Sequence, residues 1–360
     1  MKFSDIVVIG GGPAGMSAAL AAADAGVRVT LMDRGQVLGG QLIKQTHRFF
    51  GSERERAGTR GIEIVKILRQ EIEENKNIEV LKDTECLGIY SDGVISYEAA
   101  GKYGLMTGEK VIIATGAAEK MLQFENNDLP GVYGAGAVQT LMNVYGIQPG
   151  QKVLMIGAGN IGLIVSYQLM QAGVKVAAIV EAMPKIGGYK VHASKVARMG
   201  VPILTRKTCK AALGTDHVTG AIIADMDEHF QFIPGTEEEI EVDTICLAVG
   251  LAPLSELVSQ TRCKMRYIPQ LGGFVPERDE NLELTTKGYY VAGDVSCIEE
   301  ATAAMIEGSI AGLSAAIATG MNHPEIIGKR DEWIEQLKNL RSGKTGAKIR
   351  SGFAVMNGGK

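Results

Sequence analysis

Two groups of three glycines in the chain have the spacing G-x-G-x-x-G. They are Gly10, Gly12, Gly15, Gly157, Gly159 and Gly162. In such a turn the first glycine permits a tight exit from a strand, and the second lets the backbone approach a pyrophosphate. The third lets the following helix pack on the strand. Because the N-terminus of that helix offers unpaired N–H groups to phosphate, the spacing predicts two dinucleotide sites.

Each glycine group is followed by an acidic residue at the end of a second apolar run. Asp33 follows Val27–Met32, and Glu181 closes the equivalent run of the second unit. A carboxylate in this position accepts hydrogen bonds from ribose hydroxyls and repels a 2′-phosphate. The Glu181 unit is therefore predicted to bind NAD(H) rather than NADP(H). The alternatives are a turn without a nucleotide, or another adenine nucleotide held as a structural ligand.

Three further side chains could take part in chemistry. Lys44 and His47 are three residues apart, just after a Gly-Gly-Gln turn, and could move a proton or bind an anionic substrate. They are the candidate catalytic residues; the alternative is a solvent-facing pair at helical spacing. Cys297 lies near a predicted helix start, which would lower the pKa of its thiol. The competing interpretation of Cys297 is a small packed residue.

Apolar periodicity places both glycine turns between a buried strand and a helix. The first unit is expected to contain a strand at Asp5–Ile9, a helix at Ala14–Ala25, a helix at Gly61–Asn75 and a buried strand at Glu109–Ala117. Turn signals in Glu125–Gly136 predict a crossing to a second domain, which begins its own glycine unit at Lys152. The buried strand in Val242–Pro253 is predicted to return to the first domain.

Two other strand ends carry small and polar residues. Ala114–Gly116 ends one buried strand, and Ala292–Asp294 ends another. Ligands of open parallel sheets lie at such carboxyl ends. Asp294 is therefore predicted either to hold a ligand hydroxyl or to cap the helix expected over Glu299–Thr319.

Composition excludes several classes of protein. The 360 residues suggest two or three domains, and 46 glycines are about twice the usual ~7%. A net charge of −4 without a basic stripe argues against nucleic-acid binding. Five scattered cysteines without a Cys-x-x-Cys pair indicate reduced thiols in a cytoplasmic protein and no metal site. No apolar run reaches the ~20 residues of a membrane span.

The C-terminal segment has a different charge balance. Between Lys329 and Lys360 there are eight Lys or Arg residues and three Asp or Glu residues. This pattern favours a solvated, partly disordered end. A docking arm for an acidic partner is the alternative.

Four motifs in a fixed order resemble those of a known family. GGGPAG, GGQ, IIATGA and YVAGDV resemble the flavoproteins of the pyridine nucleotide–disulfide oxidoreductase superfamily, over about residues 5–320. The resemblance implies an α/β fold of two Rossmann-like, three-layer ββα dinucleotide-binding domains, with the NAD domain inserted into the FAD domain. The FAD domain would span residues 1–120 and 245–325, and the NAD(H) domain 121–244. Residues 326–360 would form a C-terminal helix and basic tail.

The resemblance also implies roles for individual residues. FAD would be bound by Gly10, Gly12, Pro13, Ala14, Gly15, Asp33, Arg34, Gly40, Gln41, Cys86, Thr115, Gly116, Gly293, Asp294, Glu300 and Ala301. The second glycine unit would bind NAD(H) through Gly157, Gly159, Asn160, Ile161, Gly162 and Glu181. Gly250, at the exit of the return strand, completes the candidate cofactor-binding residues.

The chain departs from the disulfide reductases of this superfamily because it has no cysteine pair at the expected positions. GGQLIKQTHRFFGS and the motifs around Asp294 resemble instead the FAD/NAD-binding subunits of amine and amino-acid dehydrogenases, including sarcosine oxidase alpha, opine oxidase, cyanide synthase and dye-linked proline dehydrogenase. The chain also resembles flavoproteins associated with glycerol-3-phosphate dehydrogenase.

This resemblance implies an FAD-dependent, NAD(H)-linked oxidoreductase that transfers a hydride without a redox disulfide, as the electron-transfer component of a multi-subunit dehydrogenase. Expected partners are a separate iron–sulfur protein, a second flavoprotein dehydrogenase subunit and, as another possibility, a second copy of the chain. The alternatives are direct oxidation of a small amine or 2-hydroxy acid by this chain, and a non-catalytic, nucleotide-loaded scaffold.

Overall fold

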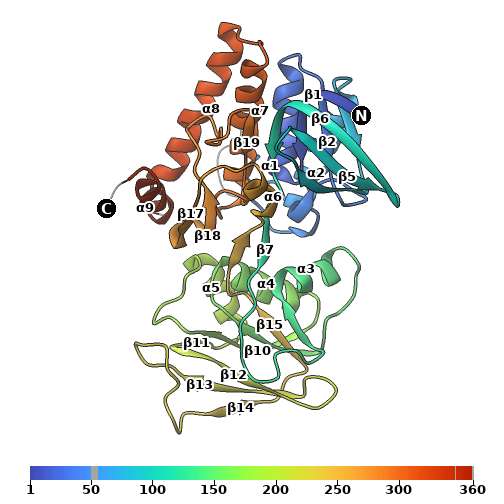
Figure 1. The fold of residues 1–360 in the computed structure, drawn as a ribbon. Coiled ribbons are helices and arrows are strands. Elements are labelled where there is room, and N and C mark those ends of the chain that lie inside the picture. Colours follow the sequence, from blue (N-terminus) through green and yellow to red (C-terminus); the bar gives the residue numbers. More distant parts are fainter. Residues whose placement is uncertain (50–55, 345, 359–360) are drawn as a thin grey trace. The chain divides into compact units, whose positions relative to one another are not determined.

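A computed structural model describes residues 1–49, 56–344 and 346–358 (Figure 1). The chain divides into two compact units. Unit 1 comprises Met1–Ala118 and Leu251–Lys360, and unit 2 comprises Glu119–Gly250. The chain enters unit 2 at Glu119, close to the start at residue 121 that the resemblance implies. It does so before the crossing predicted at Glu125–Gly136, a segment that lies within unit 2 and contributes a strand to its sheet. The return near Gly250 falls inside the range predicted for it.

Unit 1 is built on a parallel sheet with the strand order β3-β2-β1-β6-β19. The strands are β1 (Lys2–Ile9), β2 (Val29–Met32), β3 (Ile78–Leu81), β6 (Lys102–Ile113) and β19 (Tyr289–Val291). The antiparallel strands β4 (Thr84–Ile89) and β5 (Val94–Ala99) extend the sheet beyond β6. The predicted α/β class is confirmed, and the carboxyl ends of β2, β1, β6 and β19 share one edge of the sheet.

Helices pack on one face of this sheet. They are α1 (Pro13–Asp24), α2 (Gly61–Glu74) and α7 (Ala301–Ala318), and a 3₁₀ turn, η1, spans Gly40–Lys44. Gly308 lets α7 approach α1 closely, since a Cβ there would lie 2.1 Å from the carbonyl oxygen of Ala14. By length and composition α7 could cross a membrane, but 78% of it is buried. In the described residues it packs as the core helix of unit 1.

The C-terminal part of unit 1 is folded, contrary to the expected solvated tail. Helices α8 (Pro324–Ser342) and α9 (Ala347–Met356) follow α7 and are orange to dark red in Figure 1. Strands β17 (Met265–Ile268) and β18 (Gly273–Pro276), joined by the 3₁₀ turn η3 (Pro269–Leu271), form a hairpin. Apolar side chains of α9 pack on this hairpin through Ile349 and Met356. The short helix α6 (Glu256–Gln260) precedes the hairpin, and β7 (Ala117–Glu119) pairs with β16 (Leu251–Pro253).

Unit 2 repeats the plan of unit 1. Its parallel sheet has the order β11-β10-β9-β15-β8. The strands are β8 (Val132–Gly134), β9 (Lys152–Ile156), β10 (Lys175–Glu181), β11 (Ile203–Thr205) and β15 (Thr244–Leu247). The helices are α3 (Ala135–Asn143), α4 (Asn160–Gln171) and α5 (Lys190–Arg198). An antiparallel sheet of β12 (Lys207–Leu213), β13 (Gly220–Asp225) and β14 (Glu238–Ile240) completes the unit.

Candidate functional site

The glycine turn of unit 1 joins β1 to α1, and its three glycines meet different requirements. Gly10 has φ +108°, and a Cβ there would lie 2.4 Å from the carbonyl oxygen of Ala114. A Cβ on Gly15 would lie 1.7 Å from the carbonyl oxygen of Gly10. A Cβ on Gly12, by contrast, would have no heavy atom of the described residues within 4 Å. The fold therefore requires the first and third glycines, but not the second.

The glycine turn of unit 2 joins β9 to α4 and repeats these three environments. Gly157 has φ +103°, and its Cβ would lie 2.4 Å from the carbonyl oxygen of Ala248. The Cβ of Gly162 would lie 2.0 Å from the carbonyl oxygen of Gly157, while that of Gly159 would meet nothing in the described structure within 4 Å. In both units the middle glycine borders open space at a helix N-terminus. This geometry fits a dinucleotide pyrophosphate, which needs close backbone approach there.

The two predicted acids make equivalent hydrogen bonds. Asp33 Oδ2 accepts from the N–H of Gly11 at 2.5 Å, and Glu181 Oε2 accepts from the N–H of Ala158 at 2.8 Å. In each unit the donor is the residue directly after the first glycine. The second carboxylate oxygen accepts from an N–H two residues further along the chain, that of Gly35 or Met183. Each acid is thus fixed beside its glycine turn, where its remaining lone pairs could accept hydrogen bonds from ribose hydroxyls.

A Gly-Gly pair lies against each glycine turn: Gly39–Gly40 in unit 1 and Gly187–Gly188 in unit 2. The N–H of Gly39 donates to the carbonyl oxygen of Gly11 at 2.7 Å, and the N–H of Gly188 donates to that of Ala158 at 2.9 Å. The sequence interpretation included Gly40 but missed Gly187–Gly188. The signal was present, because both Gly-Gly pairs begin six residues after the acid of their unit. The internal repeat therefore extends beyond the strand, turn and acid to this covering loop.

The remaining residues predicted for unit 1 are distributed along one edge of its sheet. Thr115 and Gly116 follow β6, and Gly293 and Asp294 follow β19. Gly293 also meets the glycine turn, since a Cβ there would lie 2.9 Å from the Cβ of Ala14. The chain order changes direction between β1 and β6, and such a switch point is where ligands of open α/β sheets bind.

Several predicted residues lie at the margins of this edge. Arg34, Gln41 and Glu300 are exposed. Cys86 is on β4, next to a register shift, and the first residue of that strand, Thr84, donates its N–H to the Asp33 carbonyl oxygen at 2.9 Å. Gly250, Asn160 and Ile161 belong to unit 2, where Asn160 Oδ1 accepts from the N–H of Tyr189 at 2.8 Å. The roles of all these residues remain predictions.

The candidate catalytic residues lie at the end of η1 and in the segment after it. Lys44 is buried and His47 half-buried, so the alternative of a solvent-facing pair is wrong for Lys44. The His47 ring stacks on Phe49 with a centroid distance of 5.7 Å. In the described residues no group of three or more His, Cys, Asp or Glu side chains could hold a metal ion.

In the segment after β19, one of the two alternatives for Asp294 and one of the two for Cys297 are wrong. Asp294 does not cap α7, which begins at Ala301; its Oδ1 accepts from the N–H of Glu299 at 3.2 Å. Cys297 does not have a lowered pKa. Burial raises the pKa of this thiol well above its usual value, and the charges of Glu299 and Glu307 add to the effect. Cys297 is therefore a packed thiol, as the competing interpretation held.

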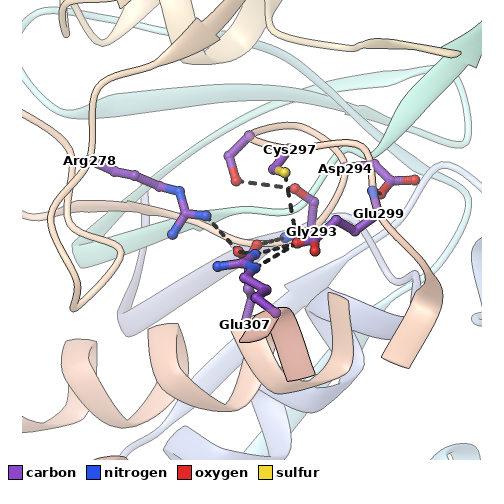
Figure 2. Close-up of polar contacts among 8 residues, drawn as sticks. Arg278, Gly293, Asp294, Cys297, Glu299 and Glu307 are labelled. Atoms are coloured by element: carbon purple, nitrogen blue, oxygen red, sulfur yellow. Dashed lines mark hydrogen bonds and ion pairs between the residues drawn. The ribbon is translucent and has the colours of Figure 1, made fainter. Parts of the chain in front are cut away.

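A buried charge cluster supports the Gly293–Asp294 turn (Figure 2). Glu307 of α7 forms ion pairs with Arg278 at 2.5 Å and Arg341 at 2.6 Å, and accepts from the N–H of Gly293 at 2.9 Å. Burial alone would raise the pKa of Glu307, but the two arginines bring it below its usual value. Burial raises the pKa of Asp294 to about 7, with the Glu299 N–H opposing and the Glu307 and Glu299 charges adding to the increase.

Comparison with known proteins agrees with this geometry. Residues 4–327 match the family model described as pyridine nucleotide-disulphide oxidoreductase. The chain is 28% identical over 314 residues to the alpha subunit of sarcosine oxidase from Rhizobium meliloti (strain 1021), which covers 83% of this chain. It is 27% identical over 335 residues to an opine oxidase subunit of Rhizobium meliloti, covering 89% of this chain. The predicted resemblance is thereby confirmed.

These relatives are longer than the chain. The matched region is 30% of the sarcosine oxidase sequence and 64% of the opine oxidase sequence. Among solved structures, thioredoxin reductase of T. acidophilum matches with a TM-score of 0.72 and 23% identity, covering 88% of this chain and 99% of that chain. At this level of identity the match establishes the fold. The chemistry of the site depends on its own residues and does not follow from the fold.

Proposed function

Because the chain belongs to the pyridine nucleotide-disulphide oxidoreductase family, we propose that it is an oxidoreductase that binds FAD in unit 1 and NAD(H) in unit 2. The observation that carries this proposal is the paired environment of Gly12 and Gly159. Each position holds a glycine although the described protein leaves room for a side chain. A pyrophosphate that contacts the backbone at both positions gives a reason for the glycines.

The residues of each unit would bind and orient their nucleotide. In unit 1 the N-terminus of α1 would face the FAD pyrophosphate, Asp33 would accept from the adenosine ribose, and Asp294 would contact the ribityl chain. In unit 2 the N-terminus of α4 and Glu181 would hold NAD(H) in the same way. With both nucleotides bound, the flavin and nicotinamide rings supply the redox chemistry, which is hydride transfer.

The thiols of the chain support a mechanism without a disulfide relay. All five cysteines are free, and burial raises the pKa of each thiol, to about 11 for Cys86 and about 12 for Cys209. A nucleophilic redox thiol needs a lowered pKa. We therefore assign the protein's contribution to positioning and electrostatics.

A pair of alanine variants tests the proposal. Gly12→Ala should abolish copurified FAD, and Gly159→Ala should retain FAD but lose anaerobic flavin bleaching by NADH. Gly328→Ala on α8 is the matched control, because its Cβ would also enter open space. Wild-type protein purified without flavin, or Gly159→Ala reduced by NADH as fast as wild type, would contradict the proposal.

We also propose that the chain is the electron-transfer subunit of a larger dehydrogenase for a small amine or amino acid. The support is that the relatives are named as subunits of sarcosine and opine oxidases. Purification from native cells under mild conditions should recover a second flavoprotein subunit. Rapid turnover of such a substrate by the isolated chain with a soluble acceptor would argue against this proposal.

A second candidate function is direct substrate oxidation by unit 1. Lys44 favours this function, because lysine side chains are seldom buried and this one lies close to the Gly39–Gly40 loop. Lys44→Met should then abolish flavin reduction by the organic substrate and preserve reduction by NADH. Equal loss in both half-reactions would assign Lys44 to structure instead.

A further inference from the structure

Glu307 is the one charged residue of the mostly apolar helix α7. Its neighbours in α7 are mostly alanine, glycine and isoleucine, and its side chain is 2% exposed. Burying a carboxylate is costly unless it is paired and hydrogen-bonded. Glu307 therefore depends on its partners to offset the cost of its burial.

The two oxygens of Glu307 have different partners. Oε2 accepts from the N–H of Gly293, while Oε1 binds Arg278 and Arg341. Figure 2 shows Arg278 pointing at Glu307 and the Gly293 turn on the carboxylate's other side. One oxygen thus fixes the backbone of a turn at the cofactor edge. The other is held by two cations that come from the loop after β18 and from α8.

The arginines are themselves held by α9. The guanidinium carbons of Arg278 and Arg341 lie 5.0 and 4.9 Å from the centroid of the Phe353 ring, a distance at which cations and aromatic rings attract. Arg341 Nε also donates to Glu299 Oε2 at 2.9 Å. A continuous set of contacts therefore runs from Phe353 through the two arginines and Glu307 to the Gly293 N–H.

We propose that Glu307 is a positioning residue, which sets the Gly293–Asp294 turn for the flavin cofactor and is itself held by the C-terminal helices through Arg341 and Phe353. This inference rests on the proposed binding of FAD in unit 1. The backbone of Gly293 is left-handed, with φ +78°, and this conformation sets the direction of its N–H. Loss of the acceptor at Glu307 would release that N–H and with it the carboxyl group of Asp294.

The test uses the 360-residue chain, stripped of flavin and titrated with FAD. In Glu307→Gln, one amide N–H must face either Gly293 or the arginines, so one of these donors loses its acceptor. A charge-assisted hydrogen bond is lost, and FAD affinity should fall about 10- to 100-fold. Arg341→Met should also weaken FAD binding. Arg341→Lys should weaken it less, because lysine retains the positive charge. Glu325→Gln, in an exposed pair with Lys329 on α8, is the control and should bind as wild type.

A pH series separates positioning from general loss of structure. The charges of Glu299 and Glu307 both raise the pKa of Asp294. Removing the charge at Glu307 should therefore move the pH midpoint of FAD affinity downward, whereas partial unfolding would lower affinity equally at all pH values. Folding is checked by urea unfolding followed through Trp333, the only tryptophan, which lies on α8 of unit 1.

The outcomes are distinct. A folded Glu307→Gln protein with wild-type FAD affinity and midpoint would overturn the inference. If that variant does not fold, Arg341→Met decides, and unchanged FAD affinity would overturn it equally. Wild-type protein that binds no FAD would instead refute the proposed function, and the positioning role with it.

Discussion

Replacing Asp294 with asparagine should stabilise the flavin-free protein, and more strongly at high pH. Burial raises the pKa of Asp294 from 3.8 to about 7. The folded protein therefore resists ionisation that the unfolded chain allows. Asparagine keeps the oxygen that accepts from the Glu299 N–H but has no charge to bury.

The sign and size follow from proton linkage. Below pH 3.8 Asp294 is protonated in both states and contributes nothing. As the pH rises from there to about 7, the unfolded chain ionises first, and the wild type loses about 1.4 kcal/mol of stability per pH unit. The full loss is about 4 kcal/mol, an upper value because Asp294 keeps some solvent exposure. The Asp294→Asn variant does not lose this stability, because asparagine does not ionise.

The assay is urea unfolding of flavin-free wild type and Asp294→Asn, followed through Trp333 fluorescence. The gain in unfolding free energy on substitution should be up to about 3 kcal/mol larger near pH 8 than near pH 5, because the wild type loses stability over the two pH units from 5 to about 7. The same variant should bind FAD more weakly, because the carboxylate that would contact the ribityl chain is gone. A gain that is constant with pH would refute the assignment of a raised pKa to Asp294.

Three further predictions concern other parts of the chain. Gly10→Ala should destabilise unit 1 by about 1–3 kcal/mol, unlike Gly12→Ala, because it strains φ +108° and places a Cβ against the Ala114 carbonyl; urea unfolding checks this. Glu181→Gln should reduce the preference for NADH over NADPH about tenfold, measured as flavin reduction at varied nucleotide concentration. An unchanged preference would show that Glu181 does not determine nucleotide specificity. Deleting residues 344–360 should lower the stability of unit 1 by several kcal/mol, since it removes the buried side chains of α9; a fully stable truncation would show that α9 is dispensable.

The sequence predicted the parts of the fold that depend on local pattern. Strands and helices around both glycine turns were found because a buried strand, a G-x-G-x-x-G turn and a helix without internal breaks follow one another within about thirty residues. The helix at Gly61–Glu74 was found from its apolar periodicity. Helix α9 was missed although Ile349, Phe353 and Met356 recur at helical spacing, because the glycines and positive charges of the segment favoured a solvated end.

The charge cluster was not predictable for a different reason. Glu307 stands out in the sequence as an acid within an apolar helix, so a buried polar role could have been suspected. Its partners Arg278, Gly293 and Arg341 lie 14 to 34 residues away and have no periodic relation to it. Only the tertiary fold brings them together. The same holds for the crossing point, which depends on Glu125–Gly136 joining the sheet of unit 2 through β8.

The two units also anchor corresponding strands in a similar way. β19 and β8 each lie two strands from the strand that precedes the glycine turn. β8 ends at Gly134, and Gly293 follows the end of β19 after one residue. In unit 1 the following turn is fixed by Glu307. In unit 2 Glu119 accepts from the Gly136 N–H at 2.6 Å and would contact any Cβ on Gly134. Each segment is thus held by a glutamate, but from different elements, since Glu307 lies on α7 and Glu119 ends β7. The pairing with Arg278 and Arg341 belongs to unit 1. The effect of Arg341 variants should accordingly be confined to FAD, with NADH affinity of unit 2 unchanged.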